Sequence, residues 1–161
     1  MPSGCRDRRA SSDVPARSPD RGVDGEEHEL KYMLLMGGTQ TDWDSMNTWA
    51  PEDLEAHFNH MNIIDKELRD SGELVDGQGL APPDQAKIVV AGEGGAPEVT
   101  DGPFPEAKEF LAGYWMVECN SLDRALEIAA RTSSAPGPGG APMNMPIEVR
   151  EVMEAPAAEE M

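Results

Sequence analysis

The amino-acid sequence predicts an α+β fold, in which an antiparallel sheet carries helices on one face. A short apolar run at 30–36 (LKYMLLM) ends at two glycines and is typical of a buried strand. A long stretch with helical spacing follows it, and a similar order of strand, helix and strand recurs after residue 113. Between these two units lie short β-type runs joined by a glycine-rich turn, which indicates an antiparallel hairpin.

The first long helix is expected to begin at Pro51 and to end near Gly72. Proline suits the first helical turn because its missing N–H has no partner there, and glycine accepts the left-handed backbone that often ends a helix. Between these points apolar residues recur at helical spacing, at Leu54, Phe58, Met61, Ile64 and Leu68. The stripe predicts an amphipathic helix of about twenty residues.

The remaining elements follow from local patterns. Residues 74–75 and 88–90 are expected in strands, and GEGG at 92–95 is expected to form a hairpin turn. The segment 113–120 (GYWMVECN) is typical of a central strand, and Asn120 or Ser121 can cap the helix that follows it. A proline- and glycine-rich loop then leads to a last strand, IEVREVME.

This order of elements indicates the split βαβ, ferredoxin-like arrangement, with both helices on one face of the sheet. The other face would then leave Val, Ile, Leu, Trp and Met side chains in water. An apolar surface of that size is rare on a monomer. We therefore expect a homodimer in which the two sheets pack together.

The chain has 161 residues, which is the size of one domain. Residues 1–28 contain no aromatic side chain and few large aliphatic ones, so we expect a disordered N-terminal tail there. The folded domain is expected at 29–154, followed by a short acidic tail at 155–161.

Charge limits the classes of partner. The net charge is −18, and residues 29–161 hold 8 Lys and Arg against 25 Asp and Glu, a net of −17. Such a surface repels phosphate backbones and anionic lipids, so neither nucleic acid nor a membrane is an expected partner. No apolar run approaches the length of a membrane span. Two cysteines, Cys5 and Cys119, favour a reduced cytoplasmic location over a disulfide scaffold, and Cys119 is expected to be a buried core thiol.

Asp101 lies in the stretch EVTDGPFPEAKEF at 98–110 and admits two interpretations. Asp-Gly followed by proline is a strong turn signal, so Asp101 could simply redirect the chain by accepting hydrogen bonds from its own downstream backbone N–H groups. The same glycine and proline could instead hold one carboxylate rigidly at a strand end. There it could act as a general base or orient a histidine. The local sequence leaves both interpretations open.

The histidines of the first helix provide the other candidates. The helical wheel places His57 on the buried face and His60 at its border, where an imidazole can contact both a cleft and solvent. His60 is therefore a candidate for proton transfer, although an ordinary half-exposed helix residue fits the same position. We expect no metal, because zinc needs three or four ligands and no CxxC or HExxH motif supplies them. The glycine-rich segments lack the context of a phosphate-binding loop, and no cofactor is expected.

Several segments together resemble a known family: KYMLLM, GELVDGQGLAPP, VTDGPFPEAKEFLAGYWMVEC, SLDRALEIAAR and IEVREVME. Over residues 30–154 the chain is similar to the YCII-related family with a DGPF motif, a branch of the dimeric α+β barrel superfamily. The resemblance implies a ferredoxin-like subunit that dimerises through its sheet. It also implies a cleft with a catalytic histidine and aspartate, which His60 and Asp101 match best by position. The loop at 133–146 replaces a shorter connection in many members.

Two functions are compatible with these observations. In the first, the protein is a small enzyme without a cofactor, in which Asp101 polarises His60 and His60 moves a proton on a small molecule. The resemblance includes a relative that removes chloride from a chlorinated hydroxyhydroquinone. In the second, the protein is a non-catalytic dimeric module that binds a ligand or regulates a partner. Some relatives are linked genetically to sigma factors, which would place this module in transcriptional regulation. The substrate or ligand is not specified by the sequence.

Overall fold

The computed structural model describes residues 30–104 and 106–154. Its strands are β1 (Leu30–Gly38), β2 (Leu74–Gly79), β3 (Lys87–Ala91), β4 (Pro97–Asp101), β5 (Phe110–Cys119) and β6 (Ile147–Glu151). Its helices are α1 (Gln40–Met46), α2 (Pro51–Ser71) and α3 (Leu122–Ser133), with short 3-10 turns η1 (Pro83–Gln85), η2 (Glu93–Gly95) and η3 (Pro138–Gly140). This confirms the predicted α+β class. The tails expected at 1–28 and 155–161 lie outside the described residues.

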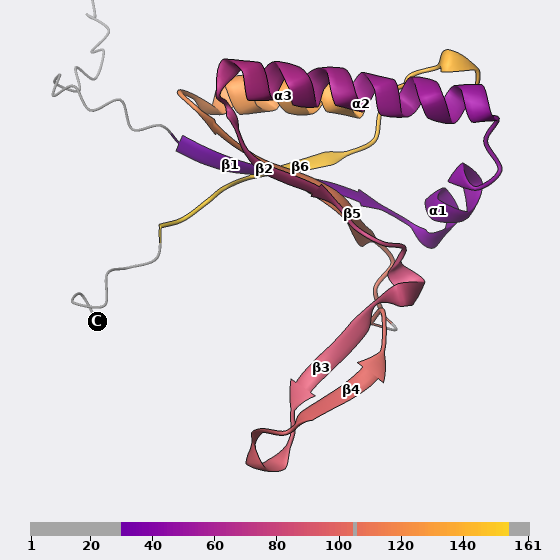
Figure 1. Cartoon of the computed structure of the whole chain (residues 1–161), viewed down its shortest axis with the longest axis vertical. Coiled ribbons are helices and arrows are strands. Elements are labelled where there is room, and N and C mark those ends of the chain that lie inside the picture. The colour runs from indigo at the N-terminus through magenta and orange to yellow at the C-terminus, as the bar shows by residue number, and fades with distance from the viewer. Residues whose placement is uncertain (1–29, 105, 155–161) are drawn as a thin grey trace, which may run out of the picture.

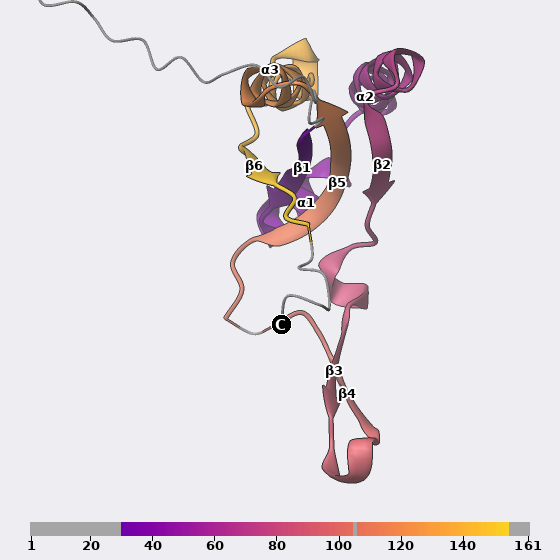
Figure 2. The same cartoon turned by 90° about the vertical axis from the view of Figure 1, so that its left-hand side faces the viewer.

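The main sheet has four strands in the order β2-β5-β1-β6, and all of its neighbouring strands are antiparallel. Helices α2 and α3 lie side by side over the same face of this sheet, as Figures 1 and 2 show. The predicted ferredoxin-like arrangement with both long helices on one face is therefore confirmed.

The hairpin formed by β3 and β4 is separate from the main sheet. It extends away from the sheet and the helices (Figure 1). The turn expected at 92–95 lies at its tip, where Ala91 pairs with Pro97. Pro82 and Pro83 separate β2 from β3. Because proline has no N–H to donate, this pair ends the ladder of β2 and lets the chain leave the sheet.

The core lies between the sheet and the helix layer. Alternate residues of β1 and β5 point toward the helices, as the period of two in a strand requires. They meet apolar residues from the inner faces of α2 and α3 in one cluster of Tyr32, Leu34, Met36, Ile64, Leu68, Trp115, Val117, Cys119, Ala125, Ile128 and Ala129. Cys119 is 5 % exposed and is thus the core thiol that the sequence predicts.

The ends of both long helices agree with their sequence signals. Helix α2 begins at Pro51, and Gly72 ends it with a left-handed φ of 79°. The Ser121 hydroxyl caps α3 by accepting a hydrogen bond from the Arg124 N–H at 3.2 Å. Arg124 also forms a two-pronged contact with Glu73, with N–O distances of 2.7 and 2.8 Å. This ion pair ties the start of β2 to α3 and holds the pKa of Glu73 below its usual value.

One residue of the predicted apolar stripe on α2, Phe58, is not buried. Phe58 is 55 % exposed, whereas His57 beside it is buried. The reason is the loop that follows α3, because its Pro136 carbonyl accepts a hydrogen bond from His57 Nδ1 at 3.1 Å. This loop covers the His57 side of the helix, whereas the Phe58 side chain remains more than half exposed.

Gly77 allows the Trp115 side chain to lie against β2. The two residues are opposite each other in the β2–β5 register. A Cβ atom at Gly77 would lie 2.2 Å from Trp115 Cδ1, which is closer than any real contact. Glycine at this position therefore makes room for the largest side chain of the core cluster.

We expect Gly77→Ala to lower the free energy of unfolding by about 1 to 3 kcal/mol, the usual cost of overpacking a core. Urea denaturation followed by tryptophan fluorescence measures this change. Gly79→Ala is the matched control, because a Cβ at Gly79 meets no atom within 4 Å. Equal losses in the two variants would show that strand glycines, rather than the Trp115 contact, set the effect.

Candidate functional site

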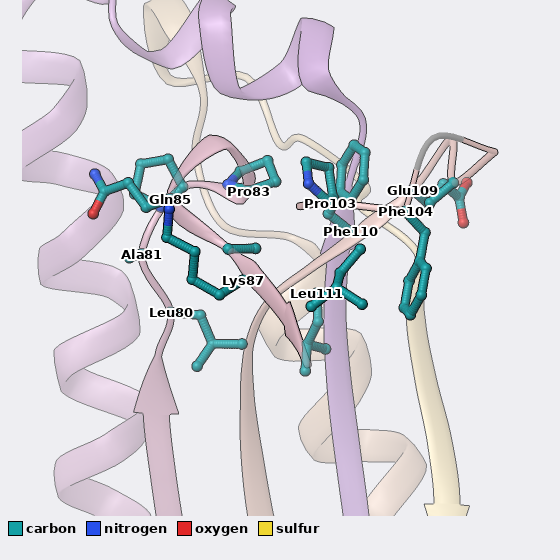
Figure 3. Close-up of a pocket in the computed structure, with 14 residues that line it drawn as sticks. Leu80, Ala81, Pro83, Gln85, Lys87, Pro103, Phe104, Glu109, Phe110 and Leu111 are labelled. Carbon is teal, nitrogen blue, oxygen red and sulfur yellow. The ribbon is translucent and has the colours of Figure 1, made fainter. Parts of the chain in front are cut away.

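A cavity of about 430 Å³ lies where the β3–β4 hairpin joins the main sheet, and Figure 3 shows its lining. We name it the hairpin-base cavity. Three segments surround it: the stretch 80–88, the DGPF loop (residues 101–104) together with Ala107, and the start of β5. Its walls are mostly apolar, and they include Leu80, Pro83, Ile88, Phe104, Phe110 and Leu111. The volume lies within the range of small-molecule sites, about 300 to 1,000 Å³.

Asp101 stands at the end of β4, opposite Lys87 in the hairpin register. Its carboxylate contacts the Lys87 ammonium, and the side chains of Asp101 and Lys87 are 84 % and 60 % exposed. The ion pair thus joins the two strands at the base of the hairpin, on a surface that is exposed to solvent. The contact that Asp101 makes is across the strands, in contrast to the bonding to its own downstream backbone that a simple turn role implies.

The next residues of the motif build the cavity wall. The Gly102 N–H donates to the Ala86 carbonyl at 2.9 Å. A Cβ atom at Gly102 would lie 3.2 Å from both Ala86 Cβ and Ala86 O, so only glycine fits this approach without displacement. The Gly102–Pro103 peptide bond is cis. Pro103 and Phe104 then line the cavity, as Figure 3 shows.

The polar groups of the cavity are few. They belong to Gln85, Lys87 and Glu109, and the charge of Lys87 is balanced by Asp101. No cysteine, serine or histidine is among the described lining residues. The arrangement can hold an apolar ligand and offer it an amide and a carboxylate, while its described lining supplies no hydroxyl or thiol nucleophile.

The two histidines of α2 lie in the helix layer, at the predicted buried and border positions. His60 Nε2 lies 2.9 Å from the Arg131 carbonyl, near the end of α3. His57 is buried, bonds the Pro136 carbonyl, and meets the Trp49 ring edge-on at a centroid distance of 5.7 Å. Both histidines therefore fasten α2 to α3 and to the loop after it. Neither lines the hairpin-base cavity.

The sequence-predicted pair of His60 and Asp101 does not meet within one chain. His60 belongs to α2, whereas Asp101 ends a strand of the protruding hairpin, and Figures 1 and 2 show these elements far apart on different sides of the sheet. Their polar contacts also differ, with the Arg131 carbonyl for His60 and Lys87 for Asp101.

Residues 30–104 and 106–154 contain no group of three or more His, Cys, Asp or Glu placed to hold a metal ion. Within the same residues, every helix is too short or too polar to cross a bilayer.

Lys87 was not among the candidates from the sequence, although one signal could have identified it. Counting outward from the GEGG turn pairs Ala91 with Pro97 and Lys87 with Asp101. The cavity itself could not be found in this way, because its walls come from segments that only the folded chain brings together.

We expect the Lys87–Asp101 ion pair to contribute at most about 1 kcal/mol, because both side chains are largely exposed. A double-mutant cycle with Asp101→Asn and Lys87→Met, followed by urea denaturation, measures the coupling free energy. If Asp101→Asn costs several kcal/mol even in the Lys87→Met background, Asp101 stabilises the loop through a contact other than this ion pair.

Comparison with known proteins agrees with the motif. The family model for the YCII-related domain matches residues 30–141, which include every residue that lines the hairpin-base cavity. A protein of Rhizobium meliloti (strain 1021), described as uncharacterized, is 29 % identical over 111 residues, which cover 69 % of this chain and 89 % of the relative. The resemblance found in the sequence is thereby confirmed, and the chain belongs to the YCII-related domain family.

Proposed function

We propose that this YCII-related protein binds a small molecule in the hairpin-base cavity. The observation that carries the proposal is the role of the DGPF motif. Asp101 closes the hairpin base, Gly102 packs tightly against Ala86, and Pro103 and Phe104 form a wall of the cavity. The motif that the resemblance names thus helps to shape a cavity.

The lining favours a ligand with an apolar body and little net charge. Phe104 and Phe110 offer aromatic contacts, and the ring of Phe104 is exposed enough to meet an incoming molecule. Lys87 is already paired with Asp101, so an anionic ligand would have to compete with that carboxylate. Gln85 and Glu109 can bond a hydroxyl or an amide on the ligand.

The open face of the main sheet supports a homodimer as the functional unit. Met33, Leu35, Tyr114 and Met116 are half-buried there, on the face opposite the helices. Charged residues flank them, including the ion pair of Lys31 with Glu118. An apolar centre with a polar rim is the usual composition of a protein interface. A second copy that packs sheet against sheet would cover this centre.

Proton transfer by His60 and Asp101 is the second candidate function. Because the two residues are apart within one chain, this function needs Asp101 from a second copy to approach His60. The exposure of the Asp101 side chain, 84 %, is the observation that favours it, since a neighbouring chain could reach the carboxylate.

In a regulatory variant of the first proposal, the dimer would instead present its acidic surface to a basic protein partner, such as a sigma-factor regulator.

Filling the cavity tests the first proposal. Indole, benzyl alcohol and benzamide serve as probes, and saturation-transfer NMR on the full chain measures binding. We expect at least one probe to bind, and Ala107→Trp to weaken it by about tenfold or more, because the new ring occupies ligand volume. Ala91→Trp, on the hairpin but outside the cavity, is the control. The proposal fails if no probe binds, or if both variants lose binding equally.

The dimer and the second candidate share another test. Sedimentation velocity at micromolar concentration should give a dimer, and Met116→Lys on the open sheet face should shift it toward monomer. Leu126→Lys, on the exposed side of α3, carries the same charge change and should leave the dimer intact. A wild-type monomer would exclude both the dimer and proton transfer between copies, while binding in the hairpin-base cavity would remain possible.

A further inference from the structure

A second cavity, of about 690 Å³, adjoins the start of β5. Its walls come from the end of β1, the start of α1, the segment that leads into β6, and the first residues of β5. Glu109, Phe110 and Leu111 line both cavities, but every other wall differs. We name it the acidic cavity.

The charges that line this cavity all have one sign. They are the carboxylates of Asp42, Glu109 and Glu148, and no Lys, Arg or His is among the described lining residues. This contrasts with the hairpin-base cavity, where Lys87 supplies a positive charge. The excess of acidic residues in the whole chain, a net charge of −18, adds to the negative potential.

The carboxylates of Asp42 and Glu148 differ in their surroundings. Asp42 accepts hydrogen bonds from the Thr39 N–H and hydroxyl, both at 2.7 Å, and these bonds hold its pKa below the usual value. Glu148 has only a loose contact with Arg150, at 3.8 Å between Nε and Oε1, and both side chains are well exposed. The negative charge of Glu148 is therefore weakly compensated in its surroundings.

The remaining lining residues decide between a metal ion and an organic cation. The carboxylates are spread around the cavity, and within the described residues no group of three acidic or other ligating side chains is placed to hold a metal. The lining also includes apolar side chains, those of Leu35, Phe110, Met143, Met145 and Ile147. Methionines adapt to irregular apolar shapes, and the face of a phenylalanine ring attracts a cation.

We propose that the acidic cavity binds a small organic cation, an ammonium group carried on an apolar or aromatic body. The body would lie against Phe110 and the methionines, and the ammonium would face the carboxylates. This site is independent of the ligand proposed for the hairpin-base cavity, because the two cavities differ in charge and in most of their walls. Leu35 lies both in the wall of the acidic cavity and on the open sheet face, so a second copy on that face would reach the edge of this cavity.

Two probes of similar size and opposite charge test the proposal. Phenethylammonium and 3-phenylpropionate share a phenyl ring on a short chain, and isothermal titration calorimetry on the full chain measures their affinities at low salt. We expect the ammonium to bind and the carboxylate to bind much more weakly or not at all. Raising the ionic strength should weaken ammonium binding, because salt screens partly exposed charges.

Matched variants locate the binding. Glu148→Gln should weaken phenethylammonium by about three- to fivefold, the range of a partly exposed ion pair. Glu98→Gln removes the same charge from the hairpin, outside both cavities, and should change the affinity little. Sedimentation of both variants at the titration concentration checks that they associate as the wild type does. Titration of Glu109→Gln should show a similar weakening of phenethylammonium binding.

Three outcomes would overturn the inference: no binding of phenethylammonium, equal affinity for the two probes, or equal weakening by Glu148→Gln and Glu98→Gln. The Ala107→Trp variant separates this result from the fate of the hairpin-base cavity. It should retain phenethylammonium while losing neutral aromatic probes. If it loses both, the cation occupies the hairpin-base cavity and the acidic cavity is not its site.

Discussion

The packing of α2 and α3 on the central strands β1 and β5 is the contact on which the rest of the molecule depends. It places one set of alternate side chains, such as Leu34 and Val117, in the core and turns the other set toward the opposite face. The helix layer thereby covers one face of the sheet and leaves the opposite face and the strand ends outside it. Both cavities lie at one of these ends, where β5 begins and β1 finishes.

The hairpin between β2 and β5 gives this end of the sheet its shape. Two prolines release the chain from β2, β3 and β4 pair with each other, and the DGPF loop returns the chain to β5. The motif therefore has a structural role: Asp101 and Lys87 form an ion pair across the base of the hairpin, and Gly102 packs closely against Ala86. Pro103 and Phe104 of the motif form part of the cavity wall, where they can contact a ligand. Asp101 does not form a proton relay with His60 within one chain, because the two residues have different partners.

The histidines of α2 occupy their predicted positions and make contacts that the sequence does not predict. His57 and His60 lie at the depths that the helical period predicts, yet each bonds a backbone carbonyl of α3 or the loop after it. These contacts hold the helix layer together above the core. They also use one ring nitrogen of each imidazole, so any proton transfer by His60 would have to operate with Nδ1 or after the bond to Arg131 opens.

The sequence by itself determined the two long helices and the main strands, because their signals are local: Pro51 and Gly72 bound α2, Ser121 caps α3, and short apolar runs indicate strands. It also determined the fold class, since the order of elements leaves few ways to bury one apolar face. It did not predict the short helix α1 (Gln40–Met46). Only the tertiary structure decided which side chains meet. Asp101 joined Lys87 rather than His60, because pairing across the hairpin depends on register and the hairpin leaves the sheet. The cavities likewise depend on segments far apart in the chain, and their approach is set by packing that no local pattern encodes.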